Sequence, residues 1–164
     1  MNVLIVVDMQ NDFITGSLGS EEAVKIVSEV VKKVKEFEGR VIFTRDTHFE
    51  NYSETSEGKK LPVSHCIKNT DGWQICRELL PYAKEIVDKI TFGSKELPLM
   101  LENPKSIELC GLCTDICVIS NAVLLKAHFP EAEISVDSSC CAGVTPESHN
   151  NALKAMEMLH ITIK

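Results

Sequence analysis

The segment from Gly111 to Val118, GLCTDICV, carries the residues best suited to chemistry, because it places Cys117 between a buried strand and a helix. The preceding residues 106–110 are largely apolar and typical of a strand, and apolar residues follow at helical spacing. Backbone amides in the first turn of a helix favour a thiolate, which lowers the pKa of an accessible cysteine. We therefore predict a nucleophilic Cys117 in a helix that Thr114 or Asp115 caps.

Two charged residues at other strand ends are candidate partners for this thiol. Asp8 follows the continuous apolar run of residues 2–7, where burial raises the pKa of a carboxyl group toward the value a general base needs. Lys89 follows the strand pattern EIVD at residues 85–88. Taken singly, Asp8 is equally well explained as a turn residue, Lys89 as a surface lysine and Cys117 as a packing residue.

The elements that must position these residues follow from the alternation of strand and helix patterns. We expect strands at residues 2–7, 40–45, 85–88, 106–110, 133–136 and 161–163, and helices at 20–37, 73–82 and 146–159 besides the one near Cys117. This alternation predicts a three-layer α/β/α fold with a six-stranded parallel sheet, in a single domain over residues 1–164. Ligands bind at the carboxyl ends of such strands, so Asp8, Asp46, Lys89 and the turn before Cys117 would share one edge.

Composition excludes several classes of partner. The net charge of -7, from 17 basic and 24 acidic residues, argues against a nucleic-acid surface. Asp8 interrupts the first apolar run, and none of the others approaches the roughly 18 residues of a membrane span, so we expect neither a membrane segment nor a signal peptide. The seven cysteines are an odd number and several lie in or beside apolar strands, which suits reduced thiols in the cytoplasm rather than disulfides.

A polar, aperiodic stretch over residues 46–71 has the length of a functional loop. Asp46 and His48 are two residues apart, so in an extended chain their side chains point the same way, and His65 can complete a set. One carboxylate and two imidazoles make a workable first coordination shell for zinc, iron or manganese. From the residues alone, ordinary polar loop side chains remain the simpler alternative.

Taken together, VVDMQNDF, the lysine after a strand and GLCTDICV resemble the isochorismatase-like cysteine hydrolases, especially their nicotinamidase branch. The resemblance covers nearly the whole chain and implies that Asp8, Lys89 and Cys117 form a catalytic triad that hydrolyses an amide C–N bond through a thioester. It also implies a cis peptide bond between Leu112 and Cys113. The backbone amides of Cys113 and Cys117 would then form an oxyanion hole.

The resemblance also implies a metal site. Nicotinamidases carry a DxH pair and a later histidine as metal ligands, which correspond to Asp46, His48 and His65. Some add a glutamate, for which Glu57 is the best positional match and Glu54 a weaker one. The expected cofactor is a divalent metal, zinc first and iron or manganese as alternatives, that binds the pyridine nitrogen and orients the ring.

The substrate pocket departs from the family pattern. Its expected walls are Phe13, Leu61, Leu112 and Ile116. The family often has an aromatic residue at position 116 and a tryptophan where Leu61 and Pro62 stand, so ring stacking would be weaker. Nicotinamide is the leading substrate, and another small amide or carbamoyl compound is the alternative. A small molecule is thus the expected partner, in an enzyme that forms a homo-oligomer as such enzymes commonly do.

A different class of protein is suggested by Cys110, Cys113 and Cys117, which read CxxCxxxC. Thiolates are preferred ligands of soft metals and iron–sulfur clusters, so a cysteine-rich metal or redox protein is a rival hypothesis. A strand that runs through a tight turn into a helix does not bring three such sulfurs together, which favours the hydrolase.

Overall fold

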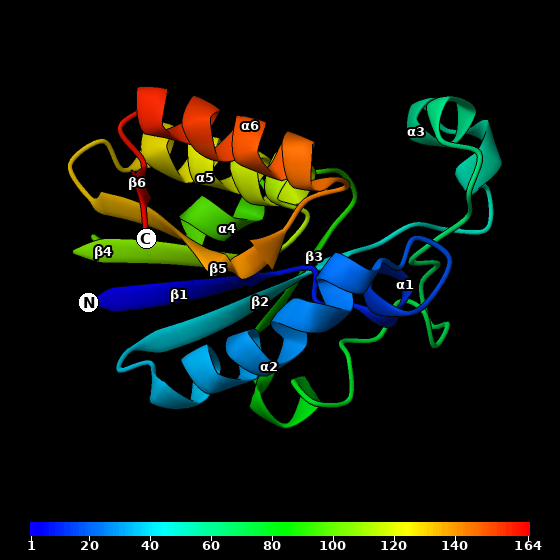
Figure 1. Ribbon diagram of the computed structural model, residues 1–164, viewed down its shortest axis with the longest axis horizontal. Helices are drawn as coiled ribbons and strands as arrows, with labels where there is room; N and C mark the ends of the chain where they lie inside the picture. Colours follow the sequence, from blue (N-terminus) through cyan, green and yellow to red (C-terminus); the bar gives the residue numbers. More distant parts are fainter.

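The computed structural model describes all residues from 1 to 164, and its centre is one parallel sheet with the strand order β3-β2-β1-β4-β5-β6 (Figure 1). The strands are β1 (Asn2–Val7), β2 (Arg40–Asp46), β3 (Ile86–Lys89), β4 (Ser106–Leu112), β5 (Glu133–Ala142) and β6 (Thr162–Ile163). Strand order reverses between β1 and β4, because the first half of the chain extends the sheet on one side of β1 and the second half on the other. The carboxyl ends of β1 and β4 therefore flank the crevice where parallel sheets bind ligands.

Helices cover both faces of this sheet. They are α1 (Asn11–Ile14), α2 (Glu21–Glu36), α3 (Ser56–Lys60), α4 (Glu96–Leu99), α5 (Ile119–His128) and α6 (Pro146–Met158), with 3-10 or π-helical turns at η1 (Tyr52–Glu54), η2 (Leu80–Tyr82) and η3 (Thr114–Val118). Figure 1 shows α2 on one face and α4, α5 and α6 together on the other, while α3 projects from the sheet on a long excursion between β2 and β3. The predicted three-layer α/β/α fold with six parallel strands is confirmed.

The two main covering helices begin at residues that satisfy their free amides. Ser20 accepts a hydrogen bond from the backbone N–H of Ala23 at the start of α2. Thr145 and Ser148 form a reciprocal capping box at the start of α6, where Pro146 occupies the first turn. Such caps typically contribute about 1 kcal/mol each. They fix where each crossover leaves the sheet.

The central strand is the most deeply buried element. Every residue from Val3 to Val7 has an exposed fraction of 0%, since β1 lies between β2 and β4 and is covered on both faces. Full burial of an aliphatic side chain is worth about 1.5–3 kcal/mol. The carboxyl end of β1 therefore projects from the most deeply buried strand of the core. None of the helices combines the length and apolar content needed to cross a membrane.

The helix predicted over residues 73–82 is wrong. Only η2 at its end is helical. The rest of the segment is held by hydrogen bonds to residues that are distant in sequence. The backbone N–H of Cys76 donates to the carbonyl of Met9. The indole N–H of Trp73 donates to Oγ1 of Thr47 at 2.9 Å, and its ring lies 3.4 Å from the Arg45 guanidinium. These partners override the local helical pattern.

Two predicted strands are longer than expected. The expected strand at residues 106–110 continues to Leu112, and the one at 133–136 continues to Ala142 past an irregularity in its pairing with β4. Cys140 and Cys141, which the sequence places after a strand, therefore lie inside β5. All seven cysteines are free thiols.

Candidate active site

Three neighbouring strands bring charged side chains to one edge of the sheet. Asp46 ends β2 and is directly paired with Lys89, the last residue of β3. Asp8 follows β1, where its positive φ of 46° turns the chain out of the sheet while its backbone N–H still donates to the Thr44 carbonyl at 3.2 Å. The predicted meeting of Asp8, Asp46 and Lys89 at one rim follows from this register.

Lys89 joins the acid and the thiol. Its Nζ lies 2.6 Å from Oδ2 of Asp8 and 3.4 Å from Sγ of Cys117, and it donates to the carbonyl of Thr91 at 3.1 Å. The other oxygen of Asp8, Oδ1, accepts a hydrogen bond from Oγ1 of Thr44 at 2.7 Å. Thr44 belongs to the site, and no sequence motif pointed to it. Water is largely excluded from these side chains, since Asp8 is 0% and Cys117 is 5% exposed.

The electrostatics of the thiol differ from the prediction. Burial, reinforced by the charge of Asp8 and opposed by Lys89, raises the pKa of Cys117 well above its ordinary value. The predicted lowering of the thiol pKa required an accessible sulfur, and this condition is not met. Burial also raises the pKa of Asp8 against the opposing charge of Lys89. The resting thiol therefore needs a base, and Asp8 is a carboxylate of increased basicity beside it.

Lys89 keeps its charge in this environment. Burial alone would lower the pKa of an ammonium group, but Asp8, Cys117 and Asp46 surround Nζ and raise the pKa of Lys89 above its ordinary value. A permanent cation thus lies between two carboxylates and a thiol. It compensates the negative charge that appears whenever the thiol loses its proton.

Cys117 lies in a π-helical turn, η3, that precedes α5. The expected caps are absent, because the hydroxyl of Thr114 bonds to Nδ1 of His149 at 2.7 Å and the carboxylate of Asp115 accepts the N–H of Val144 at 3.2 Å. The turn closes instead through the N–H of Val118, which donates to the carbonyl of Cys113 at 3.0 Å. Thr114 and Asp115 therefore tie the turn to α6 and to the loop before it.

The peptide bond between Leu112 and Cys113 is cis, as the family resemblance implies. Just before it, Gly111 has a positive φ of 113°, and a Cβ atom there would lie 2.1 Å from the carbonyl oxygen of Val7. Only glycine lets β4 approach β1 so closely at this point. The contact fixes the distance between Asp8, one residue after Val7, and the turn that holds Cys117.

A second cluster lies across the rim from the thiol. Asp46, His48, Glu57 and His65 each offer one ligand atom, and these atoms lie within 4.8 Å of one another. Nε2 of His48 is 2.9 Å from Oδ2 of Asp46, and Nε2 of His65 is 3.6 Å from the same oxygen. Oε1 of Glu57 is 3.6 Å from both imidazole nitrogens. Glu54 is not part of the group.

The donor set fits a divalent metal ion. Nδ1 of His65 donates to the carbonyl of Val63 at 2.8 Å, which leaves the lone pair of Nε2 facing the cluster. Burial acts to raise the pKa of Asp46, but the adjacent imidazoles of His48 and His65 and the charge of Lys89 hold it well below its usual range. An ionised carboxylate and imidazole nitrogens at this spacing suit zinc, iron or manganese.

A cavity of about 490 Å³ connects the two clusters. Its polar wall contains Asp46, Glu57, His65, Cys113 and Cys117, and its apolar wall contains Phe13, Leu18, Leu61, Phe92, Ile116 and Val144. Of the predicted pocket residues, Leu112 does not line the cavity, because its side chain points into the core and is 1% exposed. The sequence did not single out Leu18, Phe92 or Val144. The volume is typical of a small-molecule site.

The rival cysteine cluster does not form. Cys110 is buried within β4 away from the cavity that Cys113 and Cys117 line, and the only group of three or more potential metal ligands is the one around Asp46. This arrangement excludes the three sulfurs as ligands of one metal.

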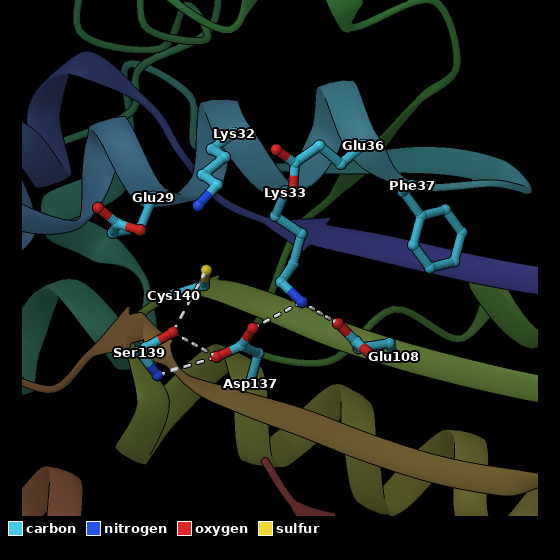
Figure 2. A pocket seen from close by; sticks show the side chains of 9 residues that line it. All are labelled: Glu29, Lys32, Lys33, Glu36, Phe37, Glu108, Asp137, Ser139 and Cys140. Carbon is cyan, nitrogen blue, oxygen red and sulfur yellow. Dashed lines mark hydrogen bonds and ion pairs between the residues drawn. The ribbon is translucent and has the colours of Figure 1, made fainter.

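A second hollow of about 340 Å³ lies between α2 and the strands β4 and β5. Figure 2 shows that Lys33 points at both Glu108 and Asp137, and its Nζ lies 2.6 Å from Oδ2 of Asp137. Burial would raise the pKa of each carboxyl, but bonds to lysine outweigh it and lower both. Lys164 also pairs with Glu108, so these two carboxylates are compensated by two lysines. The cavity beside Cys117, which also borders the ligand cluster, is the candidate active site.

Comparison with known proteins agrees with this fold. A family model described as the isochorismatase domain matches residues 2–163. The uncharacterized isochorismatase family protein PncA of Bacillus subtilis strain 168 is 31% identical over 169 residues, which cover 92% of this chain and 91% of the relative. The chain belongs to the isochorismatase family and is a hydrolase of that family.

Solved structures show the same architecture. The zinc complex of a Pyrococcus horikoshii pyrazinamidase superposes with a TM-score of 0.85 at 28% identity, covering 99% of this chain and 98% of that one. A nicotinamidase/pyrazinamidase PncA from Bacillus subtilis superposes with a TM-score of 0.87 at 26% identity, with the same coverage of both chains. The isochorismatase-like hydrolase fold therefore extends over essentially the entire chain.

Proposed function

We propose that this chain is a metal-dependent amidohydrolase with nicotinamide as its leading substrate, which it converts to nicotinate and ammonia. Residues 1–164 would act as one catalytic domain. One observation carries the proposal: Cys117, which Lys89 joins to Asp8 through buried contacts, lines the same cavity as Asp46 and His65. A nucleophile and a ring-orienting group are thus within reach of one small substrate.

The reaction begins with proton transfer from Cys117 to Asp8. The sulfur then attacks the amide carbonyl, and the tetrahedral intermediate expels ammonia when Asp8 returns the proton to the leaving nitrogen. Water attacks the resulting thioester, with Asp8 again as the base, and releases the acid and the free thiol. Lys89 holds the Asp8 carboxylate in place and keeps the local charge balanced throughout.

The negative charge on the carbonyl oxygen needs hydrogen-bond donors. We assign this role to the backbone N–H groups of Cys113 and Cys117, two residues that line the cavity, the first just before the η3 turn and the second within it. Loss of one such donor typically costs about 100-fold or more in rate. The bond from Nδ2 of Asn121 to the Cys117 carbonyl, at 2.8 Å, steadies this turn.

The metal would be held by Asp46, His48 and His65, with Glu57 as a fourth ligand, and zinc is the first candidate ahead of iron and manganese. When bound, the ion supplies a Lewis acid that attracts the ring nitrogen of a pyridine carboxamide. The relative of known structure in complex with zinc supports this choice. Phe13, whose ring centroid lies 5.5 Å from that of His65, would lie against the ring of the substrate.

The apolar wall leaves a second substrate class open. Ile116 and Leu61 provide apolar contact surface but no aromatic ring for stacking. The pocket therefore also suits another small amide or carbamoyl compound with an apolar body. We favour nicotinamide because the imidazole and carboxylate cluster faces the cavity, where an aromatic nitrogen gains most from a metal.

Two further expectations accompany the proposal. The seven free thiols suit a reducing cytoplasm. Exposed apolar side chains at Ile90, Phe92, Leu99 and Leu124 support assembly of identical copies.

Ammonia release from a substrate panel tests the proposal. The panel contains nicotinamide, pyrazinamide and small carbamoyl compounds, with and without added Zn²⁺ after chelation, and uses Cys117→Ala as the control. We expect nicotinamide to be hydrolysed with the highest kcat/KM, activity to return with metal, and Cys117→Ala to be inactive. Equal activity of Cys117→Ala would refute the mechanism, and a preference for a carbamoyl compound would replace the substrate.

A further inference from the structure

The segment after β1 sends alternate side chains to different parts of the candidate site. Asp8 contacts Lys89, and Gln10 and Asp12 turn to the chain segments that carry the ligand cluster. We propose that Gln10 and Asp12 are positioning residues that hold these segments in a metal-binding arrangement. The proposal rests on the metal site of the proposed function.

Gln10 replaces a missing strand partner. β1 leaves the sheet at Asp8, so the backbone of Asp46 in the neighbouring strand has no β1 residue to pair with. The Gln10 amide supplies both bonds, since Nε2 donates to the Asp46 carbonyl at 2.8 Å and Oε1 accepts the Asp46 N–H at 2.7 Å. Nε2 also donates to the carbonyl of Trp73 at 2.9 Å. Gln10 is 0% exposed, so no water can substitute.

Asp12 holds the segment of the second histidine. Oδ2 of Asp12 accepts the backbone N–H of Cys66, the residue after His65, at 2.7 Å. The carbonyl of Cys66 in turn accepts the backbone N–H of His48 at 2.9 Å. One carboxylate therefore holds Cys66, whose backbone follows that of His65 directly and bonds to that of His48.

Asp12 also contacts the other end of the loop formed by residues 65–72. The N–H of Asp12 donates to the carbonyl of Gly72 at 3.0 Å, and a Cβ at Gly72 would lie 2.1 Å from Oδ2 of Asp12. The loop from residue 65 to residue 72 is thus fastened near both ends. Gln10 and Asp12 together hold the backbones of Asp46, His48 and His65, whereas Glu57 lies in α3 outside this arrangement.

Substitution at either position should weaken metal binding without removing a ligand. Loss of an outer residue that orients metal ligands typically costs 10–100-fold in affinity. We expect the dissociation constant for Zn²⁺ to rise by about 10–100-fold in Gln10→Met, which keeps the size of the side chain, and in Asp12→Ala. Asp12→Asn retains an acceptor oxygen for the Cys66 N–H, and its affinity should stay near that of the wild type.

The control is Asp137→Ala. Asp137 also accepts a backbone N–H, that of Ser139 at 3.0 Å, but it lies in the hollow between α2 and β5 (Figure 2). This variant loses a comparable carboxylate and should leave the Zn²⁺ affinity unchanged. Urea unfolding of each metal-free variant separates a general loss of stability from a change in metal binding.

The test is competition for Zn²⁺ between each purified protein and a chromophoric chelator. Weaker binding in Gln10→Met and Asp12→Ala, with recovery in Asp12→Asn, supports the proposal, while wild-type affinity in folded Gln10→Met and Asp12→Ala overturns it. If Gln10→Met does not fold, Asp12→Ala decides the matter, because Asp12 is only half-buried. A wild-type protein that binds no Zn²⁺ would refute the metal site of the proposed function itself.

Discussion

Nζ of Lys89 lies 2.6 Å from Oδ2 of Asp8, and both side chains are almost fully excluded from solvent. A buried ion pair is a poor source of stability, since well-packed apolar residues of the same volume often serve as well or better. The same pair adjoins the thiol of Cys117, whose Sγ lies 3.4 Å from Nζ of Lys89. Its position is therefore best explained by chemistry.

Replacement of Lys89 by methionine should abolish activity and reduce stability. Asp8 and Asp46 would then be two buried carboxylates without a cation, and breaking a buried pair costs about 3–5 kcal/mol. We expect kcat/KM to fall at least about 100-fold. The double variant Asp8→Asn with Lys89→Met should recover stability in urea but no activity.

The exposed Lys154→Met on α6 is the matched control for Lys89→Met and should behave as wild type. A Lys89→Met enzyme with normal turnover would show that the cation is dispensable.

The pH profile should report the basicity of Asp8. Burial raises the pKa of this carboxyl, so kcat/KM should fall as acid protonates Asp8 at a pH above the ordinary range of aspartate. The hydroxyl of Thr44 stabilises the ionised form, and Thr44→Val removes that bond at constant volume. The acid limb of the profile should therefore move to higher pH in Thr44→Val.

Thr47→Val provides the comparison for Thr44→Val, since the Thr47 hydroxyl accepts from Trp73 and touches no carboxylate. Its acid limb should stay in place. Coincident profiles for wild type and Thr44→Val would argue against Asp8 as the titrating base.

Glu57 should contribute directly to metal affinity. Its Oε1 lies 3.6 Å from the imidazole nitrogens of both His48 and His65. From sequence position alone, Glu54 was also a candidate for this ligand. Glu57→Gln should weaken Zn²⁺ binding at least about tenfold, as expected when a residue of a metal site is altered. Glu54→Gln changes an exposed residue and should have no effect. Equal affinities for the two variants would remove Glu57 from the ligand set.

The metal cluster illustrates how much of the site could be predicted from sequence. Spacing predicted that Asp46 and His48 lie side by side and offered His65 as a third ligand, but Glu57 came only from family resemblance, because a loop without periodicity gives no register. The three-layer fold followed from the alternation of buried strands and helices, which depends on local pattern. The helix expected at residues 73–82 failed because Trp73 and Cys76 have partners distant in sequence.

The thiol illustrates what the sequence could not provide. The motif located Cys117 correctly after a buried strand, yet the direction of its pKa shift depends on burial, which only the packed structure shows. The role of Thr44 could not be predicted either, since no sequence motif marks a threonine inside a strand as a site residue. Leu112 looked like a pocket wall because it adjoins Cys113, but successive side chains of a strand point to opposite faces.

Gly111→Ala should disrupt the fold near the site. The positive φ of Gly111 and the 2.1 Å approach of a new Cβ to the Val7 carbonyl leave no space between β4 and β1. A loss of more than about 4 kcal/mol in the free energy of unfolding, or failure to fold, is expected for such strain in a buried strand pair. Urea unfolding measures the loss.

Gly93→Ala meets only the flexible end of the Leu124 side chain and should be tolerated. Equal stability of Gly111→Ala and Gly93→Ala would mean that the two strands can separate at no cost.

Trapping of the acyl-enzyme tests the central claim, that Cys117 attacks the substrate carbonyl, most directly. Wild-type enzyme is quenched in acid during turnover of nicotinamide, digested and examined by mass spectrometry for an acylated peptide. We predict one nicotinoyl group on the peptide that contains Cys117, and none in Cys117→Ala. Acylation of another residue, or turnover by Cys117→Ala, would contradict the account.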